Sequence, residues 1–300
     1  MNPSYRFRGV AFALVGTVSF AFRPVLIKLG YQAYPVSAST LLFLRMTLSL
    51  PFFAAMAWWF RRSDSSSTRI AHRDWLGIVG LGFLGYYLAS LLDFLGLQHV
   101  SAGLGRLIMF LYPTLVVILS AIFLKKPPTR REIAALFITY LGVALVLSTK
   151  IGGAGQREFL TGAALIFASA MCYAVYLVTG SQLVQRVGSV RFTAYTMLVS
   201  TVPAIVQFCV LESPAALDLP ARIWWIAVAL ALLCTVMPVF LVAEALKRIG
   251  ANQFALIGAL GPVTTVLADF LFLEGSLGAA QLFGGALVIC GVLLVTLKRS

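Results

Sequence analysis

Ten apolar stretches, separated by short polar segments, follow one another along the chain. Most have about 20 residues or more, the length that a helix needs to cross the hydrocarbon core of a bilayer. Strands of a membrane barrel would be about ten residues long, with alternating apolar and polar positions. The pattern therefore predicts an all-α integral membrane protein with ten transmembrane helices, at 9–29, 36–60, 75–97, 101–124, 133–148, 159–183, 192–211, 223–246, 251–273 and 277–297.

The composition of the 300 residues agrees with a lipid environment. Apolar residues make up 60 % of the chain and charged residues 11 %, against about 45–50 % and 25 % in soluble domains. These values exclude a soluble enzyme, a disordered protein and a disulfide-rich secreted domain. The cysteines have no metal-like spacing and lie in apolar stretches, so we expect small buried side chains and neither metal nor cofactor. They are Cys172, Cys209, Cys234 and Cys290.

The net charge of +13 comes from Lys and Arg grouped between the apolar stretches. A nucleic-acid partner would require them on one solvated face, so none is expected. If the ten stretches alternate in direction, sixteen of the 23 Lys and Arg residues fall on the side of the N-terminus and four on the other. Cytoplasmic loops carry such an excess. We therefore expect an inner-membrane protein of a bacterium with both termini in the cytoplasm.

The two halves of the chain resemble each other. A shift of 149 residues lays 101–143 over 250–292 and pairs Pro113 with Pro262. With five spans in each half, the second copy enters the membrane inverted, as in many secondary transporters. The sequence thus predicts two inverted five-helix repeats, at 1–150 and 151–300. Lipid and a small-molecule substrate are the expected partners, and the oligomeric state stays open.

Several short motifs carry a resemblance to a known family. They are TLLFLR at 40–45, LYPT at 111–114, AEALKRIGA at 243–251, LGPV at 260–263 and FLE at 272–274. In their order and spacing they resemble the ten-helix EamA-type permeases of the drug/metabolite transporter superfamily. The resemblance implies inverted repeats and export of amino acids or other small metabolites. Lys125 and Lys126 depart from the acidic residue that the family often has after the fourth span, and Gly261 departs from a frequent Glu.

Apart from Lys28 and Glu244 near span ends, five charged residues lie inside the predicted spans. A charge there costs about 2.5–3.5 kcal/mol unless it is paired, hydrated or functional. We predict that Arg23, Arg45 and Arg106 line a polar cavity and that an anionic or zwitterionic substrate contacts Arg23 or Arg45, because guanidinium groups suit carboxylates. Asp93 and Asp269 are candidates for proton coupling. The alternatives are Arg–Asp ion pairs, snorkelling, a structural role for Arg45, and exchange without protons.

Other polar and special residues complete the candidate site. Pro113 and Pro262 are expected within spans, as hinges or as static kinks. Asn252 and Gln253 contact substrate or cap a helix. Buried hydroxyl groups need partners, so some of the tyrosines within spans should face the cavity: Tyr86, Tyr112, Tyr173 and Tyr176.

The function predicted from these residues is secondary transport of small metabolites by alternating access, in the direction of export. The chain is not expected to be an enzyme, because His72 and His99 lie in loops on opposite sides and no metal, nucleotide or nucleophile motif is present. An integral-membrane enzyme, a receptor and a scaffold remain the alternatives.

Overall fold

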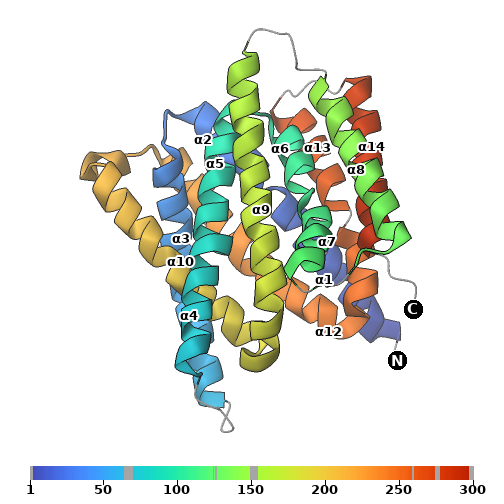
Figure 1. Ribbon diagram of the computed structural model, residues 1–300. Coiled ribbons are helices and arrows are strands. Elements are labelled where there is room, and N and C mark those ends of the chain that lie inside the picture. The colour runs from blue at the N-terminus through green and yellow to red at the C-terminus, as the bar shows by residue number, and fades with distance from the viewer. Residues whose placement is uncertain are drawn as a thin grey trace.

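The computed structural model describes residues 3–63, 70–123, 125, 127–148, 155–258, 260–273 and 278–296. Within these residues every regular element is helical, and most helices run side by side in one bundle (Figure 1). The first half contains α1 Pro3–Ala21, α2 Arg23–Ala33, α3 Ala38–Ser63, α4 His72–Leu81, the π-helical η1 Gly82–Leu88, α5 Ala89–His99, α6 Ala102–Met109, α7 Tyr112–Phe123 and α8 Arg130–Ser148. The second half contains α9 Gln156–Val187, α10 Ser189–Leu211, the 3₁₀ turn η2 Pro214–Leu217, α11 Ala221–Ala231, the π-helical η3 Leu232–Val236, α12 Met237–Gly258, α13 Leu260–Phe272 and α14 Ala279–Thr296.

The prediction of an all-α protein with membrane-spanning helices is confirmed. Among the described residues, seven helices are long and apolar enough to cross a membrane, and 260–272 and 282–294 form shorter apolar helices. The seven are Tyr5–Ala33, Ala38–Trp59, His72–His99, Ala102–Phe123, Gln156–Val187, Ser189–Leu211 and Ala221–Gly250. Large apolar side chains such as Phe137, Val210 and Leu271 are exposed on the bundle surface, as lipid contact requires.

Two of the predicted spans are interrupted, and parts of two others are joined in one helix. The first divides at Phe22 into α1 and α2, whereas its counterpart α9 is continuous over 32 residues. The fourth divides at 110–111 into α6 and α7. Gly250 has a φ of 74° inside α12, so α12 holds the end of the predicted eighth span and the start of the ninth. A positive φ suits glycine because it has no Cβ.

Pro113 lies within the candidate span Ala102–Phe123, just after the interruption at 110–111, and the roles of Pro113 and Pro262 as hinges or static kinks stay predictions. Pro113 and Pro262 stand in the first turns of α7 and α13, where the missing N–H has no helical partner to lose. The prolines inside helices are Pro51 of α3 and Pro203 of α10. Each of these removes an internal hydrogen bond from its helix. Sequence reasoning did not single out this second pair, although it also recurs at nearly the repeat spacing.

The two π-helical segments lie one repeat apart, because η1 begins at Gly82 and η3 at Leu232. A π-helical turn holds an extra residue within an α-helix and is common at functional sites. No apolar or polar pattern in the sequence predicted either segment.

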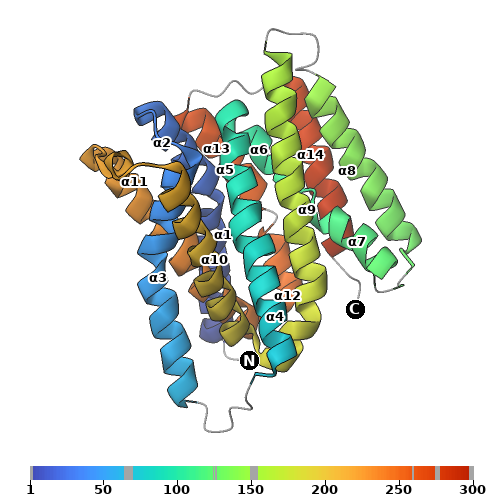
Figure 2. The same ribbon diagram turned by 60° about the vertical axis from the view of Figure 1, so that its left-hand side comes forward.

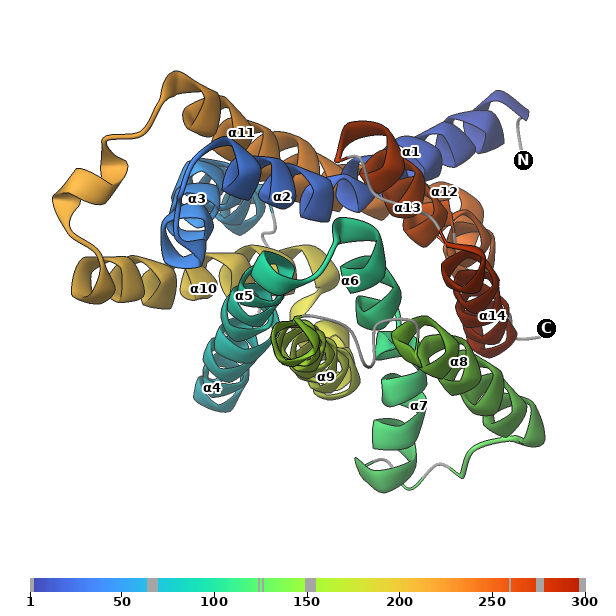
Figure 3. The ribbon, with the colours of Figure 1, turned by 90° about the horizontal axis from the view of Figure 1, so that it is seen from above.

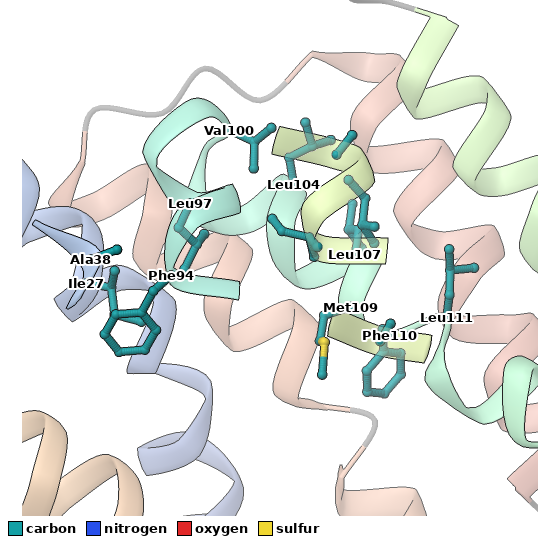
Figure 4. Close-up of a cluster of buried hydrophobic side chains, with 14 of the residues drawn as sticks. Ile27, Ala38, Phe94, Leu97, Val100, Leu104, Leu107, Met109, Phe110 and Leu111 are labelled. Carbon is teal, nitrogen blue, oxygen red and sulfur yellow. The ribbon is translucent and has the colours of Figure 1, made fainter. Parts of the chain in front are cut away.

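Helices from the two halves pack in pairs. α1 lies along α12, α5 along α9, α3 along α10 and α8 along α14; Figure 2 shows the α8–α14 pair, and Figure 3 shows the arrangement from above. Small residues allow the close approach: a Cβ on Gly96 would lie 2.9 Å from the carbonyl oxygen of Gly162. The largest buried apolar cluster joins α2, α5 and α6 through Ile27, Phe94 and Leu107 (Figure 4).

The α8–α14 contact leads to a stability prediction. A Cβ on Gly142 would lie 2.6 Å from the carbonyl oxygen of Gly284, a backbone atom that cannot move without displacing its helix. We expect Gly142→Ala to lower the free energy of unfolding by about 1–3 kcal/mol, measured as a lower melting temperature in detergent. Gly80→Ala is the control, since nothing lies within 4 Å of a Cβ there. Equal melting temperatures for the two variants would contradict the close packing.

Candidate functional site

Arg23 is the first residue of α2 and stands at the break in the first predicted span. Its guanidinium donates a hydrogen bond to Asp93 Oδ2 of α5 at 2.8 Å. Both residues are buried, with exposures of 8 % and 4 %. The structure therefore favours the ion-pair alternative for these two residues.

Arg106 of α6 lies near Arg23 through a shared aromatic contact. Its guanidinium carbon is 4.8 Å from the centre of the Phe20 ring, and that of Arg23 is 4.9 Å from the same ring. Arg106 is 8 % exposed and lies within electrostatic range of Arg23 and Asp93. Phe20 thus holds two guanidinium groups near each other by cation–π attraction.

Arg45 of α3 is 3 % exposed and has neutral contacts around it. It donates a hydrogen bond to Ser90 Oγ at 2.9 Å, and its guanidinium carbon lies 5.3 Å from the centre of the Phe94 ring. Like Arg106, it is within electrostatic range of Arg23 and Asp93. We call Arg23, Arg45, Arg106 and Asp93 the arginine cluster.

The arginine cluster carries an excess of positive charge. Three guanidinium groups face one carboxylate, which leaves two positive charges in a buried setting. The Nε atoms of the three arginines are buried and have no hydrogen-bond partner within the described residues. Removing charge from water is costly unless opposite charge and hydrogen bonds replace it. The cluster therefore suits an anionic ligand.

Four tyrosines form a continuous row of rings beside the arginine cluster. Tyr112 of α7 packs edge to face on Tyr173 of α9, which stacks on Tyr176, which in turn packs on Tyr86 of η1. Tyr112 and Tyr173 are within electrostatic range of Arg106, and Tyr86 is within range of Arg45. One end of the row therefore lies near Arg106 and the other end near Arg45. The hydroxyl groups of Tyr176 and Tyr86 lie 3.4 Å apart.

Cys234 of η3 is the contribution of the second half to this centre. The thiol is buried and lies within electrostatic range of Arg23, Arg45 and Arg106. Sequence reasoning correctly placed it among buried side chains but found no site there. The signal that it lacked is the π-helical turn, which sets the direction of the side chain and leaves no mark in the apolar pattern.

Asp269 of α13 belongs to a different place. Its Oδ2 accepts a hydrogen bond from the backbone N–H of Gly103, in the first turn of α6, at 3.0 Å. Lys28 of α2 is within electrostatic range of it. A carboxylate at a helix N-terminus is favourable because unpaired N–H groups and the helix dipole attract it. The structure thus separates Asp269 from Asp93 by their partners.

Two further candidates belong to α12. Gln253 is half-buried in α12, and the Asn252 side chain lies outside the described part of the structure. Within the described residues no three His, Cys, Asp or Glu side chains are grouped to hold a metal ion. A shallow surface depression at the start of α9 contains no residue of the arginine cluster; its lining is Gln156, Arg157, Leu160, Thr161 and Ala164.

Comparison with known proteins identifies the family. The sequence model of the EamA-like transporter family matches residues 7–148 and, a second time, residues 160–297. The uncharacterized transporter YcbK of Bacillus subtilis is 31 % identical over 284 residues, which cover 92 % of this chain and 88 % of YcbK. The threonine/homoserine exporter RhtA of Salmonella typhimurium is 25 % identical over 227 residues, covering 74 % of this chain and 68 % of RhtA.

A solved crystal structure of a protein with 19 % identity has the same fold, with a TM-score of 0.63, over 99 % of this chain and 97 % of that one. The resemblance seen in the sequence motifs is confirmed by the family match. This chain belongs to the EamA-like transporter family, within the drug/metabolite transporters.

Proposed function

We propose that this transporter is a secondary carrier that exports small metabolites, amino acids or organic acids among them, by alternating access. The observation that carries the proposal is the arginine cluster, which is buried within a bundle of membrane-spanning helices. A charged centre of this kind is costly in a membrane protein unless it serves a ligand or a conduction path. The name of RhtA as an exporter supports the direction of transport and adds amino acids to the candidate substrates.

The proposed architecture is ten transmembrane helices in two inverted repeats, 1–150 and 151–300. Three further segments would bring the seven longer spans to ten: α8, the segment from Gly250 to the end of α13, and α14. The double match of the family model, the spacing of η1 and η3, and the pairing of α1 with α12 and of α5 with α9 support this arrangement. An inverted repeat relates these two helix pairs to each other.

The proposed orientation places both termini in the cytoplasm of a bacterium whose inner membrane holds the protein. The start of α1 and the end of α14 lie toward the same end of the bundle (Figure 1), and the Lys and Arg residues are concentrated in the loops expected there. Proton coupling through Asp93 and Asp269 belongs to the proposal only as an alternative to exchange, because the two carboxylates have different partners.

Counterflow in proteoliposomes tests the transport proposal. Vesicles containing the full chain are preloaded with one compound, threonine, homoserine or a four-carbon dicarboxylate, and uptake of its labelled form is followed. We expect uptake at least about tenfold above protein-free vesicles for one class, and a loss of about tenfold or more in Arg45→Gln. Arg222→Gln removes an exposed arginine and should transport normally. A panel without uptake by the folded protein would contradict the proposal.

A further inference from the structure

The three arginines of the cluster are not equivalent. Arg23 has a carboxylate partner in Asp93. Arg45 donates to the hydroxyl of Ser90 and the sulfur of Met46, which are neutral. Arg106 donates no side-chain hydrogen bond and forms no ion pair within the described residues, and its contact is the Phe20 ring. The two uncompensated charges therefore belong to Arg45 and Arg106.

These two charges lie near different ends of the tyrosine row, Arg45 near Tyr86 and Arg106 near Tyr112 and Tyr173. Both arginines are within electrostatic range of Arg23 and Asp93, but their remaining surroundings differ. Arg45 is near Phe94 and Tyr86, whereas Arg106 is near Phe20, Tyr112 and Tyr173. A ligand with two separate acidic groups can compensate each of these charges with one group.

We propose that the substrate is a small organic dianion with two separate carboxylates, one bound by Arg45 and the other by Arg106. Guanidinium groups offer paired N–H donors that match the two oxygens of a carboxylate. A dianion would bring the net charge of the cluster to zero. Because a neutral assembly is the least costly to enclose in a low-dielectric interior, the loaded site is best suited to change its access. This inference rests on the proposed transport function and specifies its substrate class.

Gly261 provides a way to test the charge of Arg106 without removing Arg106. A Cβ on Gly261 would lie 3.9 Å from Arg106 Nη2 and 3.6 Å from Thr17 Cγ2, which are ordinary contact distances. A Cβ at this position of α13 is therefore accommodated, and a side chain there starts beside the guanidinium. Gly261→Glu places a carboxylate where the second acidic group of the substrate is proposed to bind, and Gly261→Gln has nearly the same shape without the charge.

The experiment measures binding to the purified full chain by its melting temperature, with a series of probes at neutral pH. Succinate carries two carboxylates, its monomethyl ester carries one, and succinamide carries none. Glycerol 3-phosphate places both negative charges on one group. We expect succinate to bind at least about tenfold more tightly than the monoester, because one guanidinium loses its partner in the latter. Glycerol 3-phosphate should bind no better than the monoester.

The variants assign the two ends of the ligand. Gly261→Glu should weaken the binding of succinate by about tenfold or more and remove the preference for succinate over the monoester. Gly261→Gln should retain that preference. Arg45→Gln and Arg106→Gln should each abolish the preference as well. If either arginine variant fails to fold, the Gly261 pair still decides the question.

Equal binding of succinate, monoester and succinamide would overturn the proposal, as would unchanged succinate binding in Gly261→Glu. Tighter binding of glycerol 3-phosphate than of succinate would mean that the site binds one phosphate group rather than two separate carboxylates. Counterflow of threonine that is independent of Arg106 would leave the transport function standing and reject the dianion. Succinate binding without any flux would leave the dianion site standing and reject the transport function.

Discussion

Asp93→Asn is expected to lower the free energy of unfolding by about 3–5 kcal/mol, because it leaves the buried Arg23 guanidinium without its carboxylate. The loss should be larger than for an ordinary ion pair, since the cluster already carries two excess positive charges and the substitution adds a third. Melting temperature and denaturant resistance of the purified protein in detergent measure the effect.

The double variant Arg23→Gln, Asp93→Asn separates the ion pair from simple packing. It removes both charges together and so restores the original net charge of the cluster. We expect it to recover most of the stability that Asp93→Asn alone loses, a coupling that a double-mutant cycle measures. It should also keep the preference for succinate over the monoester, because Arg45 and Arg106 are unchanged.

The matched control is the pair of Asp74 and Arg186, which joins α4 to α9 at 3.3 Å with an Arg186 side chain that is 53 % exposed. A pair screened by solvent contributes about 0–1 kcal/mol. Asp74→Asn should therefore change the melting temperature little. If Asp93→Asn were equally mild, or the double variant no more stable than Asp93→Asn, the importance of the buried pair would be refuted.

The second large effect concerns Cys234, the thiol within range of all three arginines. In a variant that keeps Cys234 and replaces Cys172, Cys209 and Cys290 by Ser, a thiol reagent with a sulfonate group should inactivate transport. An equivalent reagent with a trimethylammonium group should react at least about tenfold more slowly, because the positive potential of the cluster concentrates anions and repels cations. Labelling rates are measured from the mass of the labelled protein, which does not depend on transport, and loss of uptake is followed beside them.

Two controls accompany the labelling. A variant without any of the four cysteines should be insensitive to both reagents. Adding Arg45→Gln and Arg106→Gln to the Cys234 variant should bring the two labelling rates close together, since the excess charge is then gone. Faster labelling by the cation in the unaltered cluster would mean that Cys234 faces a negative environment and would contradict the charge assignment.

The sequence is informative about the fold because apolar length and charge distribution are local properties. The ten predicted stretches correspond to helical segments, and the breaks at 110–111 and Gly250 fall inside or between them. The helix breaks and π-helical turns depend on packing against other helices. This is why the sequence placed Pro113 within a span but did not show that a new helix begins beside it there.

The candidate site was only partly accessible from the sequence. The cost of a charge in lipid was enough to single out Arg23, Arg45, Arg106 and Asp93. The sequence did not reveal which residues pair with each other. Arg23 and Asp93 are 70 residues apart, and nothing in the sequence decides which arginine receives the carboxylate. Ser90 and Phe94 were missed for a related reason: each is an ordinary residue of a membrane helix until a charged neighbour is placed beside it.

The division of the first predicted span at Phe22 has a consequence for the energetics of the working cycle. In an inverted repeat, two access states of equal free energy require that each half can take the shape of the other. Here α1 and α2 meet at a break beside Arg23, whereas α9 is unbroken. If the halves form the proposed inverted repeat, they are therefore not interchangeable, and we expect the empty carrier to prefer one side. Such a bias makes binding from one compartment tighter than from the other even for the same ligand and the same contacts.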